Sequence, residues 1–319
     1  MKRQLKWHSL RFRVLVIAIL LVTVFGGYIW YRIHLVTRQL PMGTGPAGPK
    51  IASEAFADIW TKDEVVLIGV GDSITRGLGA TKAHTYFELL QRNDNGFFPD
   101  MVGCDLESVM PNLKAMNYAL DYTTSQEHID VQLPRIPKHT AAVKGLAVVT
   151  SGGNDLIHDY GRRKPVDGAM YGCSYEQALK WTENVKGRVR GLLEGIMDRF
   201  DGECEIFLAN IYDPTDGVGN PQNMGMARWG DCIEVLELMN SKIKELCDEY
   251  ENVHLIDIHT EFLGHGFYCT QFWRKHYKPD DPCFWYYQNL EDPNQRGYDA
   301  IRRLFLRKMP EVLSEKWKE

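Results

Sequence analysis

The hydrophobic pattern opens with an uncharged, largely apolar run of 18 residues from Val14 to Tyr31. As a helix this run would be about 27 Å long, close to the roughly 30 Å thickness of a bilayer core. It is apolar on every face, which favours a membrane-spanning helix over a helix buried in a protein core. The pattern predicts a basic segment at 1–13, a transmembrane anchor at 14–31, a linker at 32–63 and a globular domain at 64–319.

The charges that flank this run predict its orientation. More basic residues precede it (Lys2, Arg3, Lys6, Arg11, Arg13) than follow it closely (Arg32, Arg38). The positive-inside rule then keeps the N-terminus in the cytoplasm and exports the globular domain to the periplasm or the cell exterior. A cleaved signal peptide is the alternative, but the run exceeds the usual h-region of roughly 7–15 residues and no Ala-x-Ala site follows it. We therefore expect an uncleaved, single-pass signal-anchor.

The globular part alternates short apolar runs with longer amphipathic ones. The short runs are rich in β-branched residues and predict strands at 65–70, around 116–120, and at 146–150, 206–211 and 253–258. Helical spacing of apolar residues covers 174–200 and 232–250. This alternation predicts an α/β domain in which helices cover both faces of a parallel sheet.

Three segments interrupt the alternation. Leu40 to Lys50 is rich in Gly and Pro and predicts a flexible tether. Asp213 to Gly230 follows the fourth predicted strand, and Glu261 to Asn289, which contains ten aromatic residues, follows the fifth. Loops that leave the carboxyl ends of parallel strands surround the functional crevice. We therefore expect the two later segments to form one rim.

Charge and composition narrow the class of protein. With 44% hydrophobic and 25% charged residues, the chain is typical of a globular protein and unlike a disordered one. The first 53 residues hold eight Lys/Arg and no acid, so all 42 acidic residues but only 29 of the 37 basic ones follow. The resulting acidic domain lacks the positive surface that phosphate binding needs, which excludes nucleic acid as a partner.

The strongest candidate for chemistry follows the first predicted strand. There the sequence VVLIGVGDSITRGLGA runs from an apolar strand into Gly71-Asp72-Ser73 and toward a helix. Ser73 is a candidate nucleophile, although Ser and Asp are also the usual helix N-caps. Ile74 stands where a dinucleotide-binding loop needs its third glycine, and neither a P-loop nor Gly-x-Ser-x-Gly is present. We therefore predict no cofactor.

A second candidate segment, TSGGNDLIH, follows the third predicted strand. Gly153 permits a backbone to approach a ligand closely, and the amide of Asn154 is a candidate donor to an oxyanion. Gly-Gly-Asn-Asp alone is also a common turn. The two segments together carry more weight than either alone.

In this order and on these strands, the two segments resemble the SGNH hydrolase family, also called the GDSL esterases and lipases, over roughly residues 64–312. GDSITRGLGA is similar to the first family block and GGND to the third. The resemblance implies a flavodoxin-like three-layer α/β/α sandwich, an acyl-enzyme on Ser73, an oxyanion contact from Asn154, and ester hydrolysis without cofactor or metal. Asp72 and Gly153 would then contact substrate.

The sequence departs from the family in two places. Tyr122, in NYALDYTTS, stands where the family usually has an oxyanion glycine whose backbone N–H contacts substrate. NLEDPNQRGYDAI resembles the fifth block, normally Asp-x-x-His, but Asn289 replaces the aspartate and Asp292 the histidine. The usual general base is therefore missing from its usual place.

We expect the base to be relocated to a histidine near the carboxyl ends of the strands, where the candidates are His265 and His276 ahead of His158 and His259. His265 lies between two glycines that give its loop conformational freedom, and His276 precedes two aspartates in the same segment. Either imidazole would be oriented by Asp292, the third-group role of a catalytic triad. As the base itself, Asp292 would need burial to raise its pKa from about 3.9.

Three functions remain open at this point. The first is a membrane-anchored serine esterase acting on an O-acyl ester of a small molecule, glycan or lipid; the second is an acyltransferase with the same Ser73 chemistry. The third is a catalytically silent glycan- or lipid-binding relative. Seven aromatic residues are candidates either to stack on sugars and line an acyl pocket or to pack in the core: Phe267, Tyr268, Phe272, Trp273, Trp285, Tyr286 and Tyr287.

Metal binding is not predicted. Asp213 and Asp216 lie in DPTDG, where Asp and Pro supply turn geometry by themselves and no third ligand is spaced with them. The seven cysteines show no C-x-x-C spacing.

Overall fold

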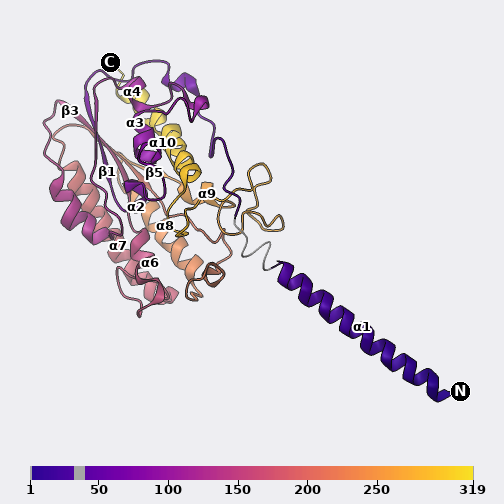
Figure 1. Cartoon of the computed structure of the whole chain (residues 1–319). Helices are drawn as coiled ribbons and strands as arrows, with labels where there is room; N and C mark the ends of the chain where they lie inside the picture. Colours follow the sequence, from indigo (N-terminus) through magenta and orange to yellow (C-terminus); the bar gives the residue numbers. More distant parts are fainter. Residues whose placement is uncertain (1, 32–39, 319) are drawn as a thin grey trace.

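The computed structural model describes residues 2–31 and 40–318 and shows one long helix projecting from a globular domain (Figure 1). This helix, α1 (Lys2–Tyr31), contains the predicted span, and its stretch Arg11–Tyr31 is long and apolar enough to cross a membrane, with a mean hydropathy of 2.3. It is the one such candidate among the described residues. Residues 32–39, the first part of the expected linker, lie outside the described residues.

The domain is built on a five-stranded parallel sheet in the order β2-β1-β3-β4-β5. The strands are β1 (Glu64–Val70), β2 (Leu113–Asn117), β3 (Val143–Thr150), β4 (Cys204–Ala209) and β5 (Val253–Ile256). This is the strand order of flavodoxin-like folds. The prediction of a parallel α/β sheet is confirmed, and each of the five strands overlaps an apolar run identified in the sequence.

Helices cover both faces of the sheet (Figure 1). Alternate residues of β1 point to opposite faces, so Val65 and Leu67 belong to one core cluster and Val66 and Ile68 to the other. The first cluster contains residues of α3 (Tyr86–Gln91), α4 (Leu106–Val109), α9 (Ile258–Phe262) and α10 (Gln295–Lys316). The second contains residues of α7 (Tyr175–Met197) and α8 (Cys232–Glu249). The three-layer α/β/α architecture is therefore present.

Shorter elements connect these layers. They are the α-helices α2 (Ser73–Arg76), α5 (Ser125–Glu127) and α6 (Gly153–Ile157), the π-helix η5 (His128–Gln132), and the 3₁₀ segments η2 (Ser53–Phe56), η3 (Lys82–His84), η4 (Pro99–Met101), η6 (Leu133–Arg135), η7 (His158–Gly161) and η8 (Pro221–Met224). The last two residues of the fifth predicted strand lie outside β5: Ile258 begins α9, and Asp257 caps that helix by accepting a hydrogen bond from the Thr260 N–H.

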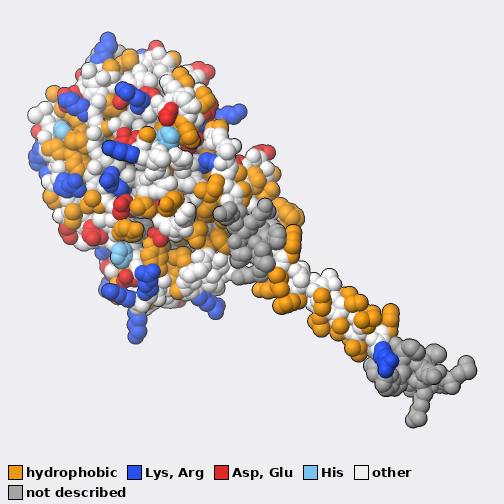
Figure 2. All heavy atoms as spheres, viewed as in Figure 1, with side chains coloured by type: hydrophobic (Ala, Val, Ile, Leu, Met, Phe, Trp, Pro, Cys, Tyr) orange, Lys and Arg blue, Asp and Glu red, His pale blue; other side chains and the backbone are white. Residues whose placement is uncertain are grey.

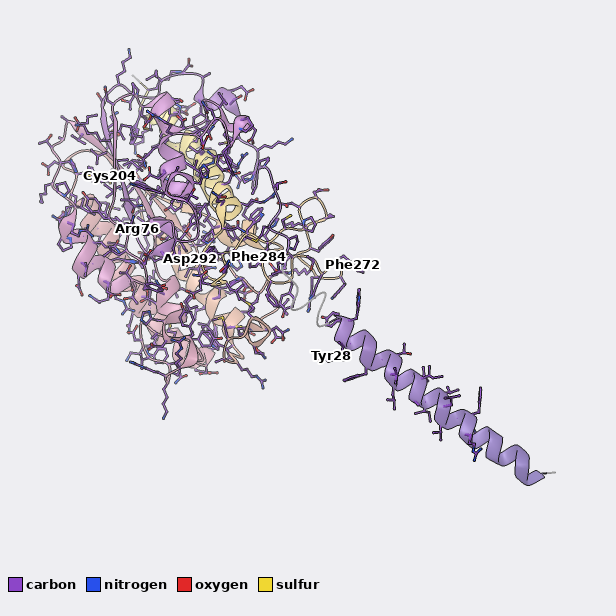
Figure 3. The ribbon with its side chains drawn as sticks, viewed as in Figure 1. Tyr28, Arg76, Cys204, Phe272, Phe284 and Asp292 are labelled. Carbon is purple, nitrogen blue, oxygen red and sulfur yellow. The ribbon has the colours of Figure 1, made fainter. Side chains whose placement is uncertain are left out.

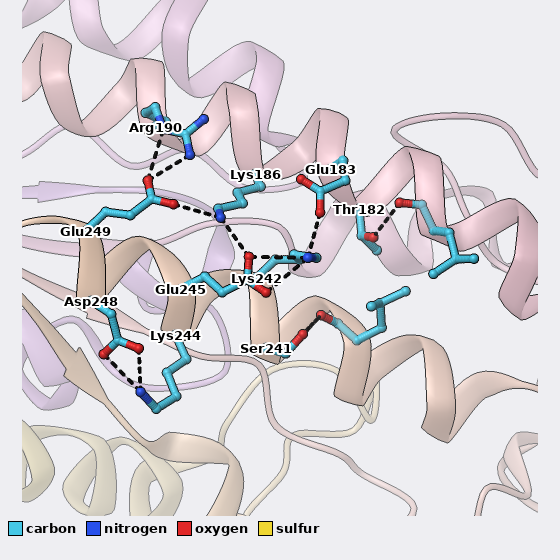
Figure 4. Close-up of polar contacts among 12 residues, drawn as sticks. Thr182, Glu183, Lys186, Arg190, Ser241, Lys242, Lys244, Glu245, Asp248 and Glu249 are labelled. Carbon is cyan, nitrogen blue, oxygen red and sulfur yellow. Dashed lines mark hydrogen bonds and ion pairs between the residues drawn. The ribbon is translucent and has the colours of Figure 1, made fainter.

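On the outer face, charged side chains join α7 to α8 (Figure 4). Lys186 Nζ lies 2.7 Å from Glu245 and 2.8 Å from Glu249. Arg190 lies 2.7 Å from Glu249, and Lys242 of α8 lies 2.6 Å from Glu183 of α7. An individual ion pair of this kind contributes little to the free energy of unfolding. Together the pairs fix how α7 and α8 lie alongside each other, while the apolar faces of both helices pack on the sheet.

The segment between residue 40 and β1 packs against the domain. Ala47 is 2% exposed, and its N–H donates to Asp299 Oδ2 over 3.0 Å. Phe56 and Trp60 are buried in the core cluster next to α10. This packing differs from the flexible tether expected from the glycines and prolines, because Asp299 supplies a buried acceptor that the composition of residues 40–50 does not reveal.

The two long loops at the carboxyl edge are joined by one carboxylate. Asp216 Oδ1 accepts hydrogen bonds from the N–H groups of Gly264 and Gly266, at 2.9 and 2.8 Å, and Oδ2 accepts from Tyr268 N–H at 2.8 Å. Asp213 similarly binds the backbone of its own turn through Thr215 and Gly217. Asp213 therefore builds the turn that DPTDG predicts, whereas Asp216 joins that turn to the 264–268 segment, so the two loops form one rim.

Candidate active site

Ser73 lies at the carboxyl end of β1, where the chain turns sharply into α2. Gly71 has φ 142°, and a Cβ there would lie 2.3 Å from the Thr150 carbonyl oxygen, so only glycine fits beside β3. Asp72 caps α2 by accepting a hydrogen bond from Ile74 N–H at 3.1 Å. Ser73 is the first helical residue, so its N–H has no acceptor within the helix.

Asp72 is buried beneath this turn. Thr150 Oγ1 donates to its Oδ1 over 2.8 Å, and the side chain is 3% exposed. Burial raises the pKa of Asp72 to about 7, against the lowering effect of the Thr150 hydrogen bond. The carboxyl group thus fastens the Ser73 turn to β3, and the substrate contact expected of it stays a prediction.

Asn154 lies at the end of the neighbouring strand, β3. Gly152, at φ 100°, begins the turn into α6, and Asn154 follows as its second residue. Asn154 Nδ2 donates to the Thr123 carbonyl over 2.9 Å. An amide nitrogen carries two hydrogens, so this bond orients the group and leaves a second donor.

Ser73, Gly153, Asn154 and Asp292 line one cleft at this edge of the sheet. The other lining residues are Asp72, Ile74, Ile157, Ile211, Tyr212, Pro214, Met226, Leu290 and Glu291. Figure 3 shows Asp292 near the middle of the domain in this view. The structure therefore brings together the expected nucleophile, the expected oxyanion donor and the residue that replaces the family histidine.

Asp292 is 2% exposed and has its two carboxyl oxygens in different surroundings. Oδ2 accepts a hydrogen bond from Asn289 Nδ2 at 2.6 Å, whereas Oδ1 is buried without a hydrogen-bond partner among the described residues. Burial raises the pKa of Asp292, the interactions with the Ser73 hydroxyl and the Asn289 amide oppose that rise, and the charge of Asp121 adds to it. Ser73 is thus close enough to Asp292 to influence its protonation.

The loop that carries Asp292 is held from several sides. Tyr160 donates a hydrogen bond to the Glu291 carboxylate, and Tyr212 donates to the Glu291 carbonyl. Tyr287 N–H donates to the Asp292 carbonyl over 2.7 Å. Leu290 adopts a left-handed conformation, with φ 64°, that turns the chain back into the cleft. These contacts hold the Asp292 carboxyl group in place against the repulsion of the nearby acids Glu291 and Asp121.

The structure does not bring His265 or His276 together with Ser73, because neither lines the Ser73 cleft. His265 is stacked on Trp285, with ring centroids 3.4 Å apart, and its Nδ1 lies 3.0 Å from the Cys283 carbonyl. Burial lowers its pKa to about 4. His276 lines a separate cavity together with His259. The expectation that one of the two reaches the space of the family histidine does not agree with these positions, since Asp216 and Trp285 fold their loop away from the cleft.

Tyr122 adopts a backbone conformation that glycine favours. Its φ of 63° lies in the left-handed region that glycine adopts without strain. Its side chain is 63% exposed, and the residue is not among those that line the cleft. Tyr122 directly precedes Thr123, the residue that orients Asn154. Its own substrate contact remains a prediction.

Two buried polar residues beneath the site were not identified from the sequence. His128 joins the loops that follow β2 and β3, with Nδ1 2.9 Å from Ser151 Oγ and Nε2 3.1 Å from Thr123 Oγ1. Burial lowers its pKa to about 3, so it is neutral. Gln132 Oε1 accepts from Gly71 N–H at 2.9 Å and its Nε2 donates to the Gly71 carbonyl at 2.7 Å. His128 and Gln132 are four residues apart, which places their side chains on one face of a helix. This spacing is the one signal in the sequence that links them.

The aromatic residues of the 261–289 loop are divided between core and surface. Tyr268, Trp285 and Tyr286 are buried, in agreement with the core-packing alternative. Phe272, Trp273 and Tyr287 are exposed, and none of the seven aromatics lines the Ser73 cleft. An acyl or sugar pocket at Ser73 is therefore built from other residues.

A family model for the GDSL-like lipase/acylhydrolase family matches residues 70–300, and the chain belongs to that family. It is an ester-hydrolysing enzyme, and the match includes both Ser73 and Asp292.

Solved structures of similar fold include lipases and esterases. An extracellular lipase from Streptomyces rimosus is 12% identical, with a TM-score of 0.47 over 76% of this chain and 97% of that one. A phospholipase A1 from Streptomyces albidoflavus is 14% identical, with a TM-score of 0.45 over 76% and 98%. An acetylxylan esterase from Geobacillus stearothermophilus is 16% identical, with a TM-score of 0.43 over 78% and 95%. No curated protein matches the sequence.

Proposed function

We propose that the protein is a membrane-anchored serine esterase in which Ser73 is the nucleophile and Asp292 is the general base. The observation that carries the proposal is the buried Asp292 carboxyl group beside the Ser73 hydroxyl, with Oδ2 bonded to Asn289 and Oδ1 unpartnered. Ser73 and Asp292 line the same cleft, and catalytic hydrogen bonds that are long in ligand-free enzymes often tighten when substrate binds.

The reaction would proceed in two steps. Ser73 Oγ attacks the ester carbonyl while Asp292 Oδ1 takes its proton, and the oxyanion receives hydrogen bonds from Asn154 Nδ2 and the backbone N–H groups of Ser73 and Gly153. Collapse releases the alcohol, which takes the proton from Asp292, and leaves an acyl ester on Ser73. Water then attacks this ester with Asp292 again as base, releasing the acid and regenerating the serine.

Burial makes a carboxylate a more effective base. An ordinary aspartate is too weak a base at neutral pH, and the raised pKa of Asp292 moves it toward the range in which bases work efficiently. Asn289 opposes part of this rise in pKa, because its amide donates to the carboxylate, and the same hydrogen bond holds the carboxylate in place. A second carboxylate there would instead repel it.

The cleft favours an apolar acyl group. It shares Ile157, Ile211, Tyr212, Pro214 and Met226 with an adjoining apolar pocket. The remaining residues of that pocket are mostly apolar as well: Leu156, Tyr171, Asp213, Thr215, Pro221, Met224, Trp229, Cys232, Ile233 and Leu236. An acyl chain extending from Ser73 into this pocket would be removed from water, which supports esters with a hydrophobic acyl chain as substrates.

We also propose that α1 anchors the enzyme, with its basic end in the cytoplasm and the cleft outside. The support is the length and hydropathy of Arg11–Tyr31 and the excess of Lys and Arg before the span. Protease added to intact cells, after opening any outer membrane, should then digest the domain and spare the cytoplasmic segment. Complete protection of the domain would contradict this topology.

The decisive experiment compares ester hydrolysis by variants of the full chain in detergent, using a chromogenic ester and a fluorophosphonate serine probe. Ser73→Ala should abolish both turnover and labelling. Asp292→Asn should lower kcat by roughly 10²–10⁴, the usual contribution of a general base. The double variant Asn289→Asp, Asp292→His, which restores the Asp-x-x-His pattern, should recover part of the loss.

Controls separate this proposal from its alternatives. His265→Ala and His276→Ala should retain the wild-type rate if they fold, as judged by the unfolding midpoint. Normal turnover by Asp292→Asn would remove Asp292 as base. The absence of labelling and turnover in the wild type would favour a silent binding protein, and acyl transfer to an added alcohol in preference to water would favour an acyltransferase.

A further inference from the structure

Two large aromatic side chains are exposed side by side on the 261–289 loop. Phe272 is 73% exposed and Trp273 is 46% exposed, and their rings meet edge to face with centroids 5.0 Å apart. Neither residue takes part in the core or in the Ser73 cleft. A pair of this kind on the surface of a protein domain marks an interaction site.

The pair lies at the level where the apolar helix ends. The Trp273 ring centroid is 6.4 Å from that of Tyr31, the last residue of α1. Figure 3 shows Phe272 on the edge of the domain that faces α1, with Tyr28 close by on the helix. Figure 2 shows hydrophobic side chains along α1 and on the adjoining edge of the domain. Aromatic residues at the end of a span mark the membrane–water interface.

Basic residues follow the aromatic pair directly. Lys275 and Lys278 are exposed, whereas Arg274 is half-buried with its guanidinium 4.9 Å from the centroid of the Tyr268 ring. Of the two acids that come next, Asp281 pairs with Arg296, and Asp280 is exposed. The segment that follows the aromatic pair therefore exposes two lysines and one acid.

We propose that Phe272, Trp273, Lys275 and Lys278 form an interfacial patch that binds the surface of an anionic bilayer. The aromatic rings enter the headgroup region, and the lysines bind anionic headgroups. The inference rests on the membrane anchoring by α1 proposed above. With a second contact, the domain cannot turn freely about its anchor, and the Ser73 cleft is held at a fixed height above the lipid.

The test uses the full chain in vesicles whose acyl chains are brominated, because bromine quenches tryptophan emission over short distances. Trp273→Phe keeps an aromatic ring, so subtracting its spectrum from that of the wild type isolates the emission of Trp273. We expect brominated lipid to reduce this emission at least twofold. Trp181→Phe, on α7 away from α1, supplies the matched control, and the emission of Trp181 should not change.

Trp30 of α1 distinguishes a failure of this inference from a failure of the anchor. If the emission isolated with Trp30→Phe is quenched and that of Trp273 is not, the helix spans the membrane and the patch does not bind it. If neither is quenched, membrane anchoring itself is wrong.

The lysines are tested by lipid charge. Quenching of Trp273 should be stronger in vesicles of phosphatidylglycerol than in those of phosphatidylcholine, and the difference should disappear in the double variant Lys275→Gln, Lys278→Gln. Equal quenching in both lipids would overturn the proposed role of the lysines. Quenching of Trp273 in neither, with Trp30 quenched in both, would leave a protein partner as the occupant of this surface.

Discussion

Asn289 holds Asp292 by two hydrogen bonds: its Nδ2 donates to Asp292 Oδ2 at 2.6 Å, and its Oδ1 accepts from the Asp292 N–H at 3.2 Å. The pair stands where the family has aspartate and histidine, and the two replacements suit each other. A carboxylate needs a donor as its neighbour, whereas an imidazolium needs an acceptor. The side chain of Asn289 therefore orients Asp292 through Oδ2 and the backbone N–H, and leaves Oδ1 without a bond from it.

The first prediction concerns the pH dependence of kcat/KM. A carboxylate base works only when unprotonated, so activity should rise with pH through one pKa that burial holds above the ordinary 3.8 of aspartate, and it should be lost as pH falls through that value. In Asn289→Asp, Asp292→His the acid limb should move to near 6.5, the ordinary value of imidazole. Rates measured from about pH 4 to about pH 9 check this. A wild-type limb already at the imidazole value would argue for a histidine base.

The second prediction concerns Asn154. Replacing it with Ala should lower kcat by roughly 10²–10³, the usual effect of losing one oxyanion donor, with little change in KM. Asn154→Asp, which keeps the size of the side chain but removes the donor, should be impaired at least as much. Steady-state kinetics on one ester decide the matter. A loss confined to KM would show that Asn154 binds the ground state instead.

Much of the fold could be predicted from the sequence because each central strand is an apolar run between turn residues. Ser73 and Asn154 were identifiable for the same reason, since β1 and β3 are adjacent and parallel and their carboxyl ends must meet. For both residues the signal lies in the local sequence, and the parallel pairing of β1 with β3 then brings the two segments together.

The proposed base could not be singled out in the same way because its position depends on contacts between distant loops. His265 has flexible glycine neighbours, but Asp216 binds those glycines and Trp285 stacks on the imidazole. The raised pKa of Asp292 likewise depends on burial by other segments. The place of His128 beneath the site could not be predicted either, since nothing in its own segment shows that Ser151 and Thr123 supply its hydrogen-bond partners.

The third prediction concerns the length of the acyl chain. Met226 lies between the Ser73 cleft and the apolar pocket, so Met226→Trp should obstruct passage of a long chain while leaving room for an acetyl group. We expect kcat/KM for long-chain esters to fall by about 10–200-fold, the scale of small volume changes in apolar pockets. Activity on acetyl esters is the internal control. An equal loss on all chain lengths would show that the variant disturbs the site itself.

The fourth prediction concerns Asp72 and the pH dependence of stability. Its pKa is about 7 in the folded protein against an ordinary 3.8, so between these values the folded state holds a proton that the unfolded state releases. The stability that this provides is complete below the lower value and is lost as pH rises through about 7. Asn resembles the protonated acid and also caps a helix, but it does not ionise. Asp72→Asn should therefore gain stability relative to the wild type as pH rises.

Thermal unfolding of the full chain in detergent measures this effect. The Tm of Asp72→Asn minus that of the wild type should be more positive at about pH 8 than at about pH 5, by several degrees, because a buried charge is then avoided in the variant alone. Asp201→Asn, at an exposed position, controls for the general loss of one acid and should show a much smaller dependence. A Tm difference for Asp72→Asn that stays constant across this range would mean that Asp72 is ionised throughout, held in that state by Thr150 and the N-terminus of α2.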